Sequence, residues 1–229
     1  MDSVNEANGP DLRDMSLIDE LRAEHVVIER TLGALRTYVE ARLAGNGDPD
    51  DARAFLEFFR LWAGRYHHAR EEDTLFPALL AHLPIRPDSG PLCSLVDQHA
   101  AMARTLEEMA PVLAAPHGQG GRLLDIATRY RRDLLSHIDA ENSVLLPESE
   151  TRLRRAGVAV LEGRPPDAEE RAARAEADRL ASLYPPSVDP GAIRGEGCVI
   201  CPSYGVSCEG LEREWWSEQE WDDFRERDG

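Results

Sequence analysis

One eleven-residue pattern occurs twice in the chain and constrains its fold more than any other feature. Both copies read histidine, three residues, glutamate, three residues, leucine, an apolar residue and proline, and they span residues 67–77 and 137–147. Residues four apart lie above one another on the same face of an α-helix. Each copy therefore predicts a helix that projects an imidazole and a carboxylate from one face. Together the copies predict two matching halves of one metal site in a helical bundle.

The apolar residues predict four long helices joined by short loops. Apolar stripes at helical spacing place these helices at about 16–43, 49–82, 92–114 and 122–155. Glycine- and proline-rich stretches separate them. Four consecutive helices with short connections favour an all-α fold, an antiparallel up-down-up-down four-helix bundle with a C-terminal helical and irregular extension. We expect Pro77 and Pro147 to bend or end their helices.

Changes in composition divide the chain into three parts. Residues 1–15 are polar and predict a flexible N-terminal arm. The bundle is expected to occupy residues 16–160. Residues 161–229 form the predicted extension, which contains a helix from about Asp167 to Leu183, a cysteine cluster and an acidic end rich in tryptophan.

Two further histidines lie on the inward stripes of the first and third helices. Each predicted hairpin thus supplies one lone histidine and one histidine–glutamate pair, although a single histidine on an apolar stripe is more often a core residue. The predicted metal ligands are His25, His67, Glu71, His99, His137 and Glu141. Nitrogen and oxygen donors without a thiolate suit iron, manganese or zinc. Six donors exceed the four that structural zinc takes and fit two metals about 3.5–4 Å apart.

A shift of one residue, using His68 with Glu72, is the main competing assignment. The second copy of the pattern offers no shifted pair, and a neighbour of His67 on a helix points about 100° away. We therefore expect His68 to lie outside the set of ligands. His82 and His117 are predicted to lie at the surface. Tyr130 shares the inner face of its helix with a ligand two turns later, and either a supporting role at the site or a core position fits it.

These residues as a set resemble the hemerythrin-like proteins of the HHE cation-binding group. The resemblance covers residues 16–156 and implies a non-haem di-iron site. In similar proteins both glutamates bridge the irons, one iron takes the equivalents of His25 and His137, and the other takes those of His67 and His99. Oxygen-carrying hemerythrins have a second histidine one turn after the third-helix ligand, where this chain has Ala103. The resemblance therefore implies a more symmetric and more open pair, as in the subgroup linked to nitric oxide response and the repair of iron centres.

Three of the four cysteines form a cluster near the end of the chain: Cys198, Cys201 and Cys208. Such a cluster could hold zinc or an iron–sulfur cluster if Cys93 or a partner supplied a fourth ligand. A redox pair and a tail with incidental cysteines are the alternatives. We expect the acidic, tryptophan-rich end to dock on the bundle or on a protein partner.

Charge and hydropathy narrow the classes of function. The formal net charge of −17 argues against nucleic acids and anionic membranes as partners. No run of eighteen apolar residues exists, and the first residues are acidic and lack the apolar core of a signal peptide, so we expect a cytoplasmic protein.

The six ligands leave coordination positions free for a small molecule. The leading hypothesis is a di-iron protein that binds O2, NO or peroxide in sensing or in the response to oxidative and nitrosative stress. The alternatives are a di-iron oxidoreductase (peroxidase-like, NO-reducing or iron-centre repair), an iron storage or homeostasis protein, and a site that only stabilises the bundle.

Overall fold

A computed structural model describes residues 16–85, 90–115 and 120–187 of the 229-residue chain. The first long helix is α1 (Ser16–Leu43). The second is continuous through α2 (Pro49–Glu57), η1 (Phe58–His68), η2 (Glu71–Leu75) and α3 (Phe76–His82). The third is α4 (Pro91–Ala114), and the fourth comprises α5 (Gly120–Ala140), η3 (Glu141–Leu145) and α6 (Leu146–Arg155). A further helix, α7, spans Ala168–Leu183. The predicted N-terminal arm, His117, Cys198, Cys201, Cys208 and the tryptophan-rich end lie outside the described residues.

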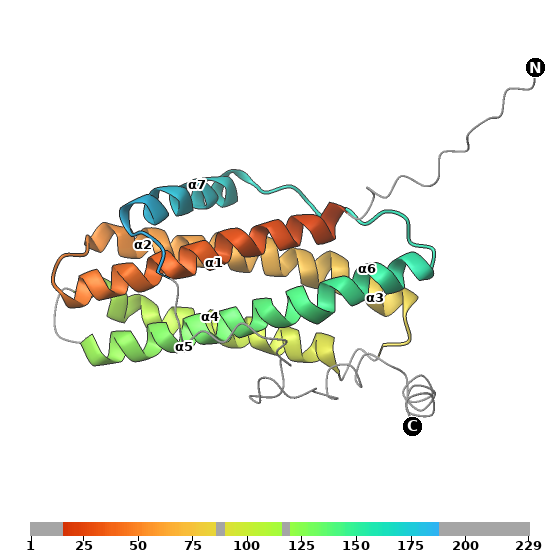
Figure 1. Ribbon diagram of the computed structural model, residues 1–229, viewed down its shortest axis with the longest axis horizontal. Coiled ribbons are helices and arrows are strands. Elements are labelled where there is room, and N and C mark those ends of the chain that lie inside the picture. The colour runs from red at the N-terminus through yellow and green to blue at the C-terminus, as the bar shows by residue number, and fades with distance from the viewer. Residues whose placement is uncertain (1–15, 86–89, 116–119, 188–229) are drawn as a thin grey trace, which may run out of the picture.

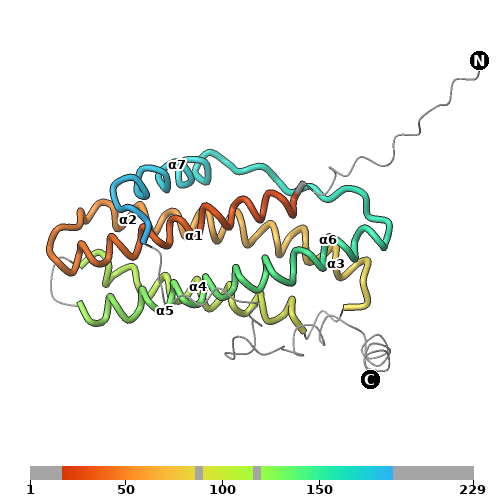
Figure 2. Tube along the Cα trace, in the orientation of Figure 1, coloured from red at the N-terminus to blue at the C-terminus, as the bar shows by residue number. Residues whose placement is uncertain are grey.

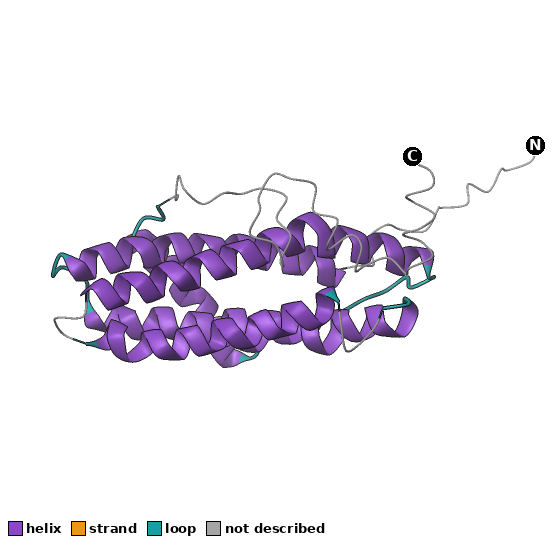
Figure 3. Ribbon diagram, turned by 90° about the horizontal axis from the view of Figure 1, so that it is seen from below, coloured by secondary structure: helices purple, strands orange, loops and turns teal. Residues whose placement is uncertain are grey.

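The four long helices run alternately in opposite directions and form the bundle that the sequence predicted (Figures 1 and 2). In Figure 1, α1 and the second helix lie side by side above the layer of α4 and the fourth helix, and α7 lies along the outside of the upper layer. The view from below shows the same elongated rods, with no strand among the described residues (Figure 3). The predicted all-α four-helix bundle is confirmed.

The second helix begins where the sequence indicates. The Asp48 carboxylate accepts a hydrogen bond from the backbone N–H of Asp50 at 2.9 Å, and Pro49 occupies the first turn. A side-chain cap satisfies one of the donors that a helix leaves free at its start, and proline loses nothing there because its missing N–H would have had no partner.

The two prolines of the repeated pattern widen their helices and do not end them. Each follows a π-helical segment, η2 or η3, and in both segments the backbone N–H of the residue before the proline donates to the glutamate carbonyl five residues back. In a regular α-helix the ring of a proline collides with the carbonyl four residues before it. A π turn at this place accommodates the ring, so the helices continue as α3 and α6. Such turns occur frequently at functional sites.

The interior of the bundle is apolar at both ends and polar in between. One cluster of buried apolar residues includes Ile28, Tyr66 and Met102, and a second includes Leu21, Leu95 and Leu145. The histidines and glutamates of the repeated pattern lie along the helices between these clusters. The predicted ligands thus form a polar layer that apolar side chains close off on both sides.

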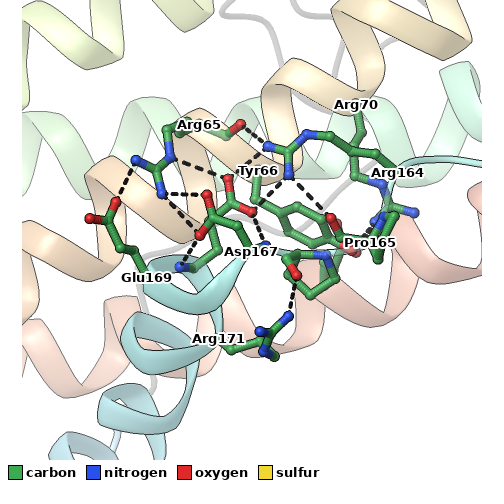
Figure 4. Close-up of polar contacts among 11 residues, drawn as sticks. Arg65, Tyr66, Arg70, Arg164, Pro165, Asp167, Glu169 and Arg171 are labelled. Atoms are coloured by element: carbon green, nitrogen blue, oxygen red, sulfur yellow. Dashed lines mark hydrogen bonds and ion pairs between the residues drawn. The ribbon is translucent and has the colours of Figure 1, made fainter.

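Helix α7 packs against α1, α2 and η1. Asp167 and Glu170 form a reciprocal cap at its start, where the Asp167 carboxylate accepts from the Glu170 N–H and the Glu170 carboxylate accepts from the Asp167 N–H. Arg65 and Arg164 donate to these carboxylates (Figure 4), and Glu170 is fully buried. The helix that the sequence predicted at this place is therefore held to the bundle by ion pairs as well as by Ala177 and Leu180. No helix in the described part of the chain is both long enough and apolar enough to cross a membrane.

Candidate metal centre

The predicted ligands come together in the polar layer of the bundle. Each long helix delivers at least one of them, and the second and fourth helices deliver the histidine–glutamate pairs of the repeated pattern. All six side chains are buried, with no more than 5 % of any residue exposed: His25, His67, Glu71, His99, His137 and Glu141. Buried ionisable side chains at this density require partners or metal ions, because each charge removed from water costs several kcal/mol.

Each glutamate turns its two oxygens toward different histidines. Oε2 of Glu141 lies 3.2 Å from Nε2 of His25, and Oε1 of Glu141 lies 3.2 Å from Nε2 of His137. Likewise, Oε1 of Glu71 lies 3.6 Å from Nε2 of His67, and Oε2 of Glu71 lies 3.5 Å from Nε2 of His99. A carboxylate that faces two separate groups of donors in this way is placed to bridge two metal ions.

The donors form two groups of four that share both glutamates. His25 and His67 complete one group, and His99 and His137 complete the other, with the donor atoms of each group within 4.8 Å of one another. This grouping corrects the pairing that the resemblance implied, which joined His25 with His137. The reason is that those two histidines face opposite oxygens of the same carboxylate.

A second ring of side chains orients the four imidazoles. Nδ1 of each histidine donates a hydrogen bond to an oxygen of a residue that neighbours a different predicted ligand. The four partners are Asn142 for His25 (2.8 Å), Glu24 for His67 (2.8 Å), Glu72 for His99 (2.6 Å) and Gln98 for His137 (2.9 Å). When Nδ1 carries the proton in such a bond, a neutral imidazole presents an unprotonated Nε2 to the centre. Outer partners of this kind fix the tautomer and the ring direction of metal-binding histidines.

Most of the inward atoms of the site lack hydrogen bonds. Among the described residues, the buried side-chain atoms without a hydrogen-bond partner include Nε2 of His25 and His67 and all four carboxylate oxygens of Glu71 and Glu141. Nε2 of His99 lies 3.0 Å from Nε2 of His137, and a hydrogen bond between them requires one of the two atoms to carry a proton. Buried acceptors without donors are unfavourable, and metal cations between them would satisfy every one. The residues present therefore fit a pair of metal ions.

The protonation of these groups follows from burial and from mutual contact. Burial and the neighbouring Glu141 raise the pKa of Glu71 well above its ordinary value. Burial also acts to raise the pKa of Glu141, but the adjacent His137 and His25 outweigh it and hold this pKa well below its ordinary value. Burial lowers the pKa of His67 and His137, which keeps both imidazoles neutral and available as ligands.

The family comparison agrees with this geometry. The model of the hemerythrin HHE cation binding domain matches residues 16–149, which is more than half of the chain and includes all six clustered ligands. The chain belongs to the hemerythrin HHE cation-binding family. Searches of curated proteins and of solved structures gave no match.

His68 lies at this hemerythrin-like centre, contrary to the expectation that it points away. Its residue is 8 % exposed, its ring stacks on His99 with centroids 4.0 Å apart, and its donor atoms lie within 4.8 Å of those of His99 and His137. The expectation assumed α-helical spacing, whereas His68 ends the π-helical segment η1, in which successive side chains are separated by a smaller angle. The competing assignment, in which His68 pairs with Glu72, is wrong, because Glu72 hydrogen-bonds to His99 at 2.6 Å.

A groove of about 930 Å³ opens beside the centre, between the second helix and α4. Its buried lining residues form the floor: Phe59, His68, His99, Met102, Leu106 and Tyr130. Ala103 lies in the lining, so the position that carries a histidine in oxygen-carrying hemerythrins contributes to an opening here. Tyr130 packs edge-to-face on Phe59 at 5.3 Å and is a core residue that also reaches the groove. His82 is exposed, as predicted.

A buried ion network supports the His67 side of the centre, and the sequence analysis did not identify it. Glu24 accepts hydrogen bonds from His67 and from Arg70, and Arg70 also donates to Glu20 and to the Tyr66 hydroxyl. Arg70 is only 1 % exposed. Burial raises the pKa of Glu24 to about 7, and the opposing effect of Arg70 is smaller. The sequence signal was present, since Glu24 precedes His25 as Gln98 precedes His99.

Proposed function

We propose that this hemerythrin-like protein holds two iron ions in the polar layer of the bundle. In this account it binds O2, NO or peroxide at their open side, in sensing or in the response to oxidative or nitrosative stress in the cytoplasm. The observation that carries the proposal is the pair of overlapping donor groups that share Glu71 and Glu141 and have inward atoms without hydrogen bonds.

The donor set favours iron over the other metals considered. Imidazole and carboxylate ligands without thiolate suit iron and manganese, and histidine-rich sites with open positions are typical of non-haem iron. Zinc in a structural site takes four ligands, and this centre offers six from the predicted set alone. Family membership supports cation binding, and the number and identity of the ions belong to the proposal.

The residues of this chain have separable roles in the proposed centre. Glu71 and Glu141 would bridge the two metals, while the four histidines would hold them individually. Asn142, Glu24, Glu72 and Gln98 fix the directions of the imidazoles. The apolar clusters above and below exclude water, which strengthens the electrostatic interactions inside. When bound, the irons supply the redox-active positions at which a small molecule is coordinated.

Optical spectroscopy of the iron-loaded protein tests this proposal. The protein would be loaded with Fe(II) without oxygen and then exposed to air, NO or hydrogen peroxide in separate samples. The expected result is a set of near-ultraviolet and visible bands that depends on the small molecule and disappears in His99→Ala, with His82→Ala as the control at an exposed histidine. Identical spectra with every small molecule would contradict the proposal.

The size of the groove favours a second candidate, a di-iron oxidoreductase with peroxidase-like activity. A space of about 930 Å³ exceeds the volume of a diatomic molecule and would admit an organic hydroperoxide. Consumption of cumene hydroperoxide by the iron-loaded protein, with ascorbate as the electron donor, tests this candidate. A rate no higher than that of the metal-free protein would remove it.

A further inference from the structure

The centre contains one buried histidine that belongs to neither group of four. His68 lies on the floor of the groove, and its Nε2 has no hydrogen-bond partner in the described part of the chain. A buried imidazole without a partner is costly, and such exceptions in native structures call for a ligand, an ion or a functional explanation. The neighbouring Gly64 and Ala103 are small, which leaves the groove open above the ring.

The stacking of His68 on His99 decides what this imidazole can contact. The centroids of the two rings are 4.0 Å apart, and their planes are inclined by only 9°. A metal ion bound by Nε2 of His99 must lie close to the plane of that ring. It would therefore lie outside the nearly parallel plane of His68, where no lone pair of the second imidazole points. The stacking therefore disfavours coordination of one metal by both rings, although the donor atoms of His68, His99 and His137 lie within 4.8 Å of one another. An atom bound on the groove side of that metal would lie within reach of His68.

We propose that the groove is the binding site for the exogenous ligand of the metal centre, and that His68 touches this ligand by donating a hydrogen bond from Nε2. The inference rests on the proposed function, because the ligand would bind to a metal ion held by His99 and His137. This ligand is a small anionic or dipolar molecule with nitrogen or oxygen donor atoms, and it would bind on the open side of that metal. His68 lies beside the His99 and His137 group only, so the surroundings of the two groups differ, although each group has two histidines and the same two glutamates. No redox step is involved, since the role is one of binding and orientation.

The first test measures azide binding to the iron-loaded protein by optical titration. His68→Phe retains a ring that can stack on His99 but removes both nitrogens. Loss of a hydrogen bond to a charged ligand weakens binding by roughly tenfold to a hundredfold. We expect this change in the azide dissociation constant with the iron content unaltered. His82→Phe, the same substitution at an exposed histidine, should bind azide as the wild type does.

Three results would overturn the role of His68. Azide affinity equal to that of the wild type in a fully iron-loaded His68→Phe protein would remove the hydrogen bond. Iron loss in His68→Phe as large as in His99→Ala would make His68 a metal ligand. His68→Gln keeps an N–H donor and should bind azide more tightly than His68→Phe. If it does not, lost packing and not the lost hydrogen bond caused the effect.

A second pair of variants tests the groove independently of His68. Ala103→Phe fills part of the groove, whereas Ala101→Phe places the same side chain at an exposed position of α4 outside the lining. Stopped-flow mixing with azide should show an association rate at least about tenfold lower in Ala103→Phe only. Equal rates in the two variants would refute the groove as the binding site.

The outcome for the wild type separates this inference from the proposed function. A wild-type protein that takes up no iron, or whose iron bands do not respond to azide, would refute both. A wild-type protein that binds azide, together with variants that bind it equally well, would refute only the inference about His68 and the groove.

Discussion

Replacing Glu71 with leucine is expected to stabilise the metal-free protein and to weaken its stabilisation by metal. Glu71 is fully buried, and neither of its carboxylate oxygens has a hydrogen-bond partner among the described residues. Burial and the nearby Glu141 raise the pKa of Glu71. Without metal, folding therefore carries the cost of burying this carboxyl, either as an unpaired charge or after it takes up a proton.

The magnitude follows from the burial of the group. A buried polar group without a partner costs about 1–3 kcal/mol, and exchanging buried ionic groups for apolar ones of similar volume often stabilises by about 1–4 kcal/mol. One kcal/mol shifts the Tm of a domain of this size by about 2–4 °C. We therefore expect the Tm of metal-free Glu71→Leu to exceed that of the wild type by roughly 3–10 °C. Metal should raise the Tm of the variant far less, because both donor groups lose a shared ligand.

Thermal unfolding followed by circular dichroism, in EDTA and in excess Fe(II) without oxygen, measures both effects. Asp73→Leu, at an exposed position of η2, is the matched control and should change neither Tm by more than about 2 °C. A lower Tm for metal-free Glu71→Leu would refute the reasoning, since it would mean that the carboxylate stabilises the bundle by itself. An equal rise in Tm with iron in both proteins would also refute it.

Three further predictions concern the chain around the centre. Gly163→Ala should lower the free energy of unfolding, measured in urea, by about 1–3 kcal/mol, because an added Cβ would lie 2.5 Å from Nε of the buried Arg70. Gly121→Ala is the control and should leave that free energy unchanged, because nothing lies within 4 Å of its added Cβ. The hydrogen bond from Arg164 holds the pKa of Glu170 at about 2, below its ordinary 4.5. A lowered folded-state pKa contributes stability that is complete above about pH 4.5 and lost as the pH falls toward 2. Glu170→Gln should therefore lower the free energy of unfolding at pH 7 by about 2 kcal/mol, a value reduced for the partial exposure of Arg164. It should also flatten the dependence of that free energy on pH below about 4.5, as measured by urea unfolding. An unchanged pH dependence would contradict the role of Glu170 in holding α7 to the bundle. Because histidines must lose their protons to bind metal, iron should leave the protein as the pH falls from about 6 to 4. Metal analysis after desalting at each pH measures this loss. Full retention of iron at pH 4 would contradict ligation by histidines.

The sequence predicted the bundle and the clustering of six side chains because both depend on regular spacing. The repeated pattern places His67 with Glu71 and His137 with Glu141 on the inner faces of two helices, and the apolar stripes bring His25 and His99 to the same layer. Helix α7 and its cap at Asp167 were likewise predictable, because a capping aspartate after two prolines is a local signal.

Other features depend on contacts that spacing alone does not specify. The position of His68 depends on a π-helical segment, which an assumption of α-helical geometry cannot produce. The grouping of His25 with His67 depends on how each carboxylate turns its two oxygens. The Arg70 network requires residues distant in sequence, since Arg70 packs beneath Gly163 and pairs with Glu24.

The number of metal ions per chain tests the central claim most directly. The 229-residue protein would be purified without added metal, and its metal content would be measured by inductively coupled plasma mass spectrometry beside His99→Ala and Glu141→Ala. The account predicts about two irons per wild-type chain and a large loss of iron in both variants. One zinc per chain that survives both substitutions would contradict the account. Such a result would place the metal elsewhere, with Cys198, Cys201 and Cys208 as its ligands, and leave the histidines of the bundle as core residues.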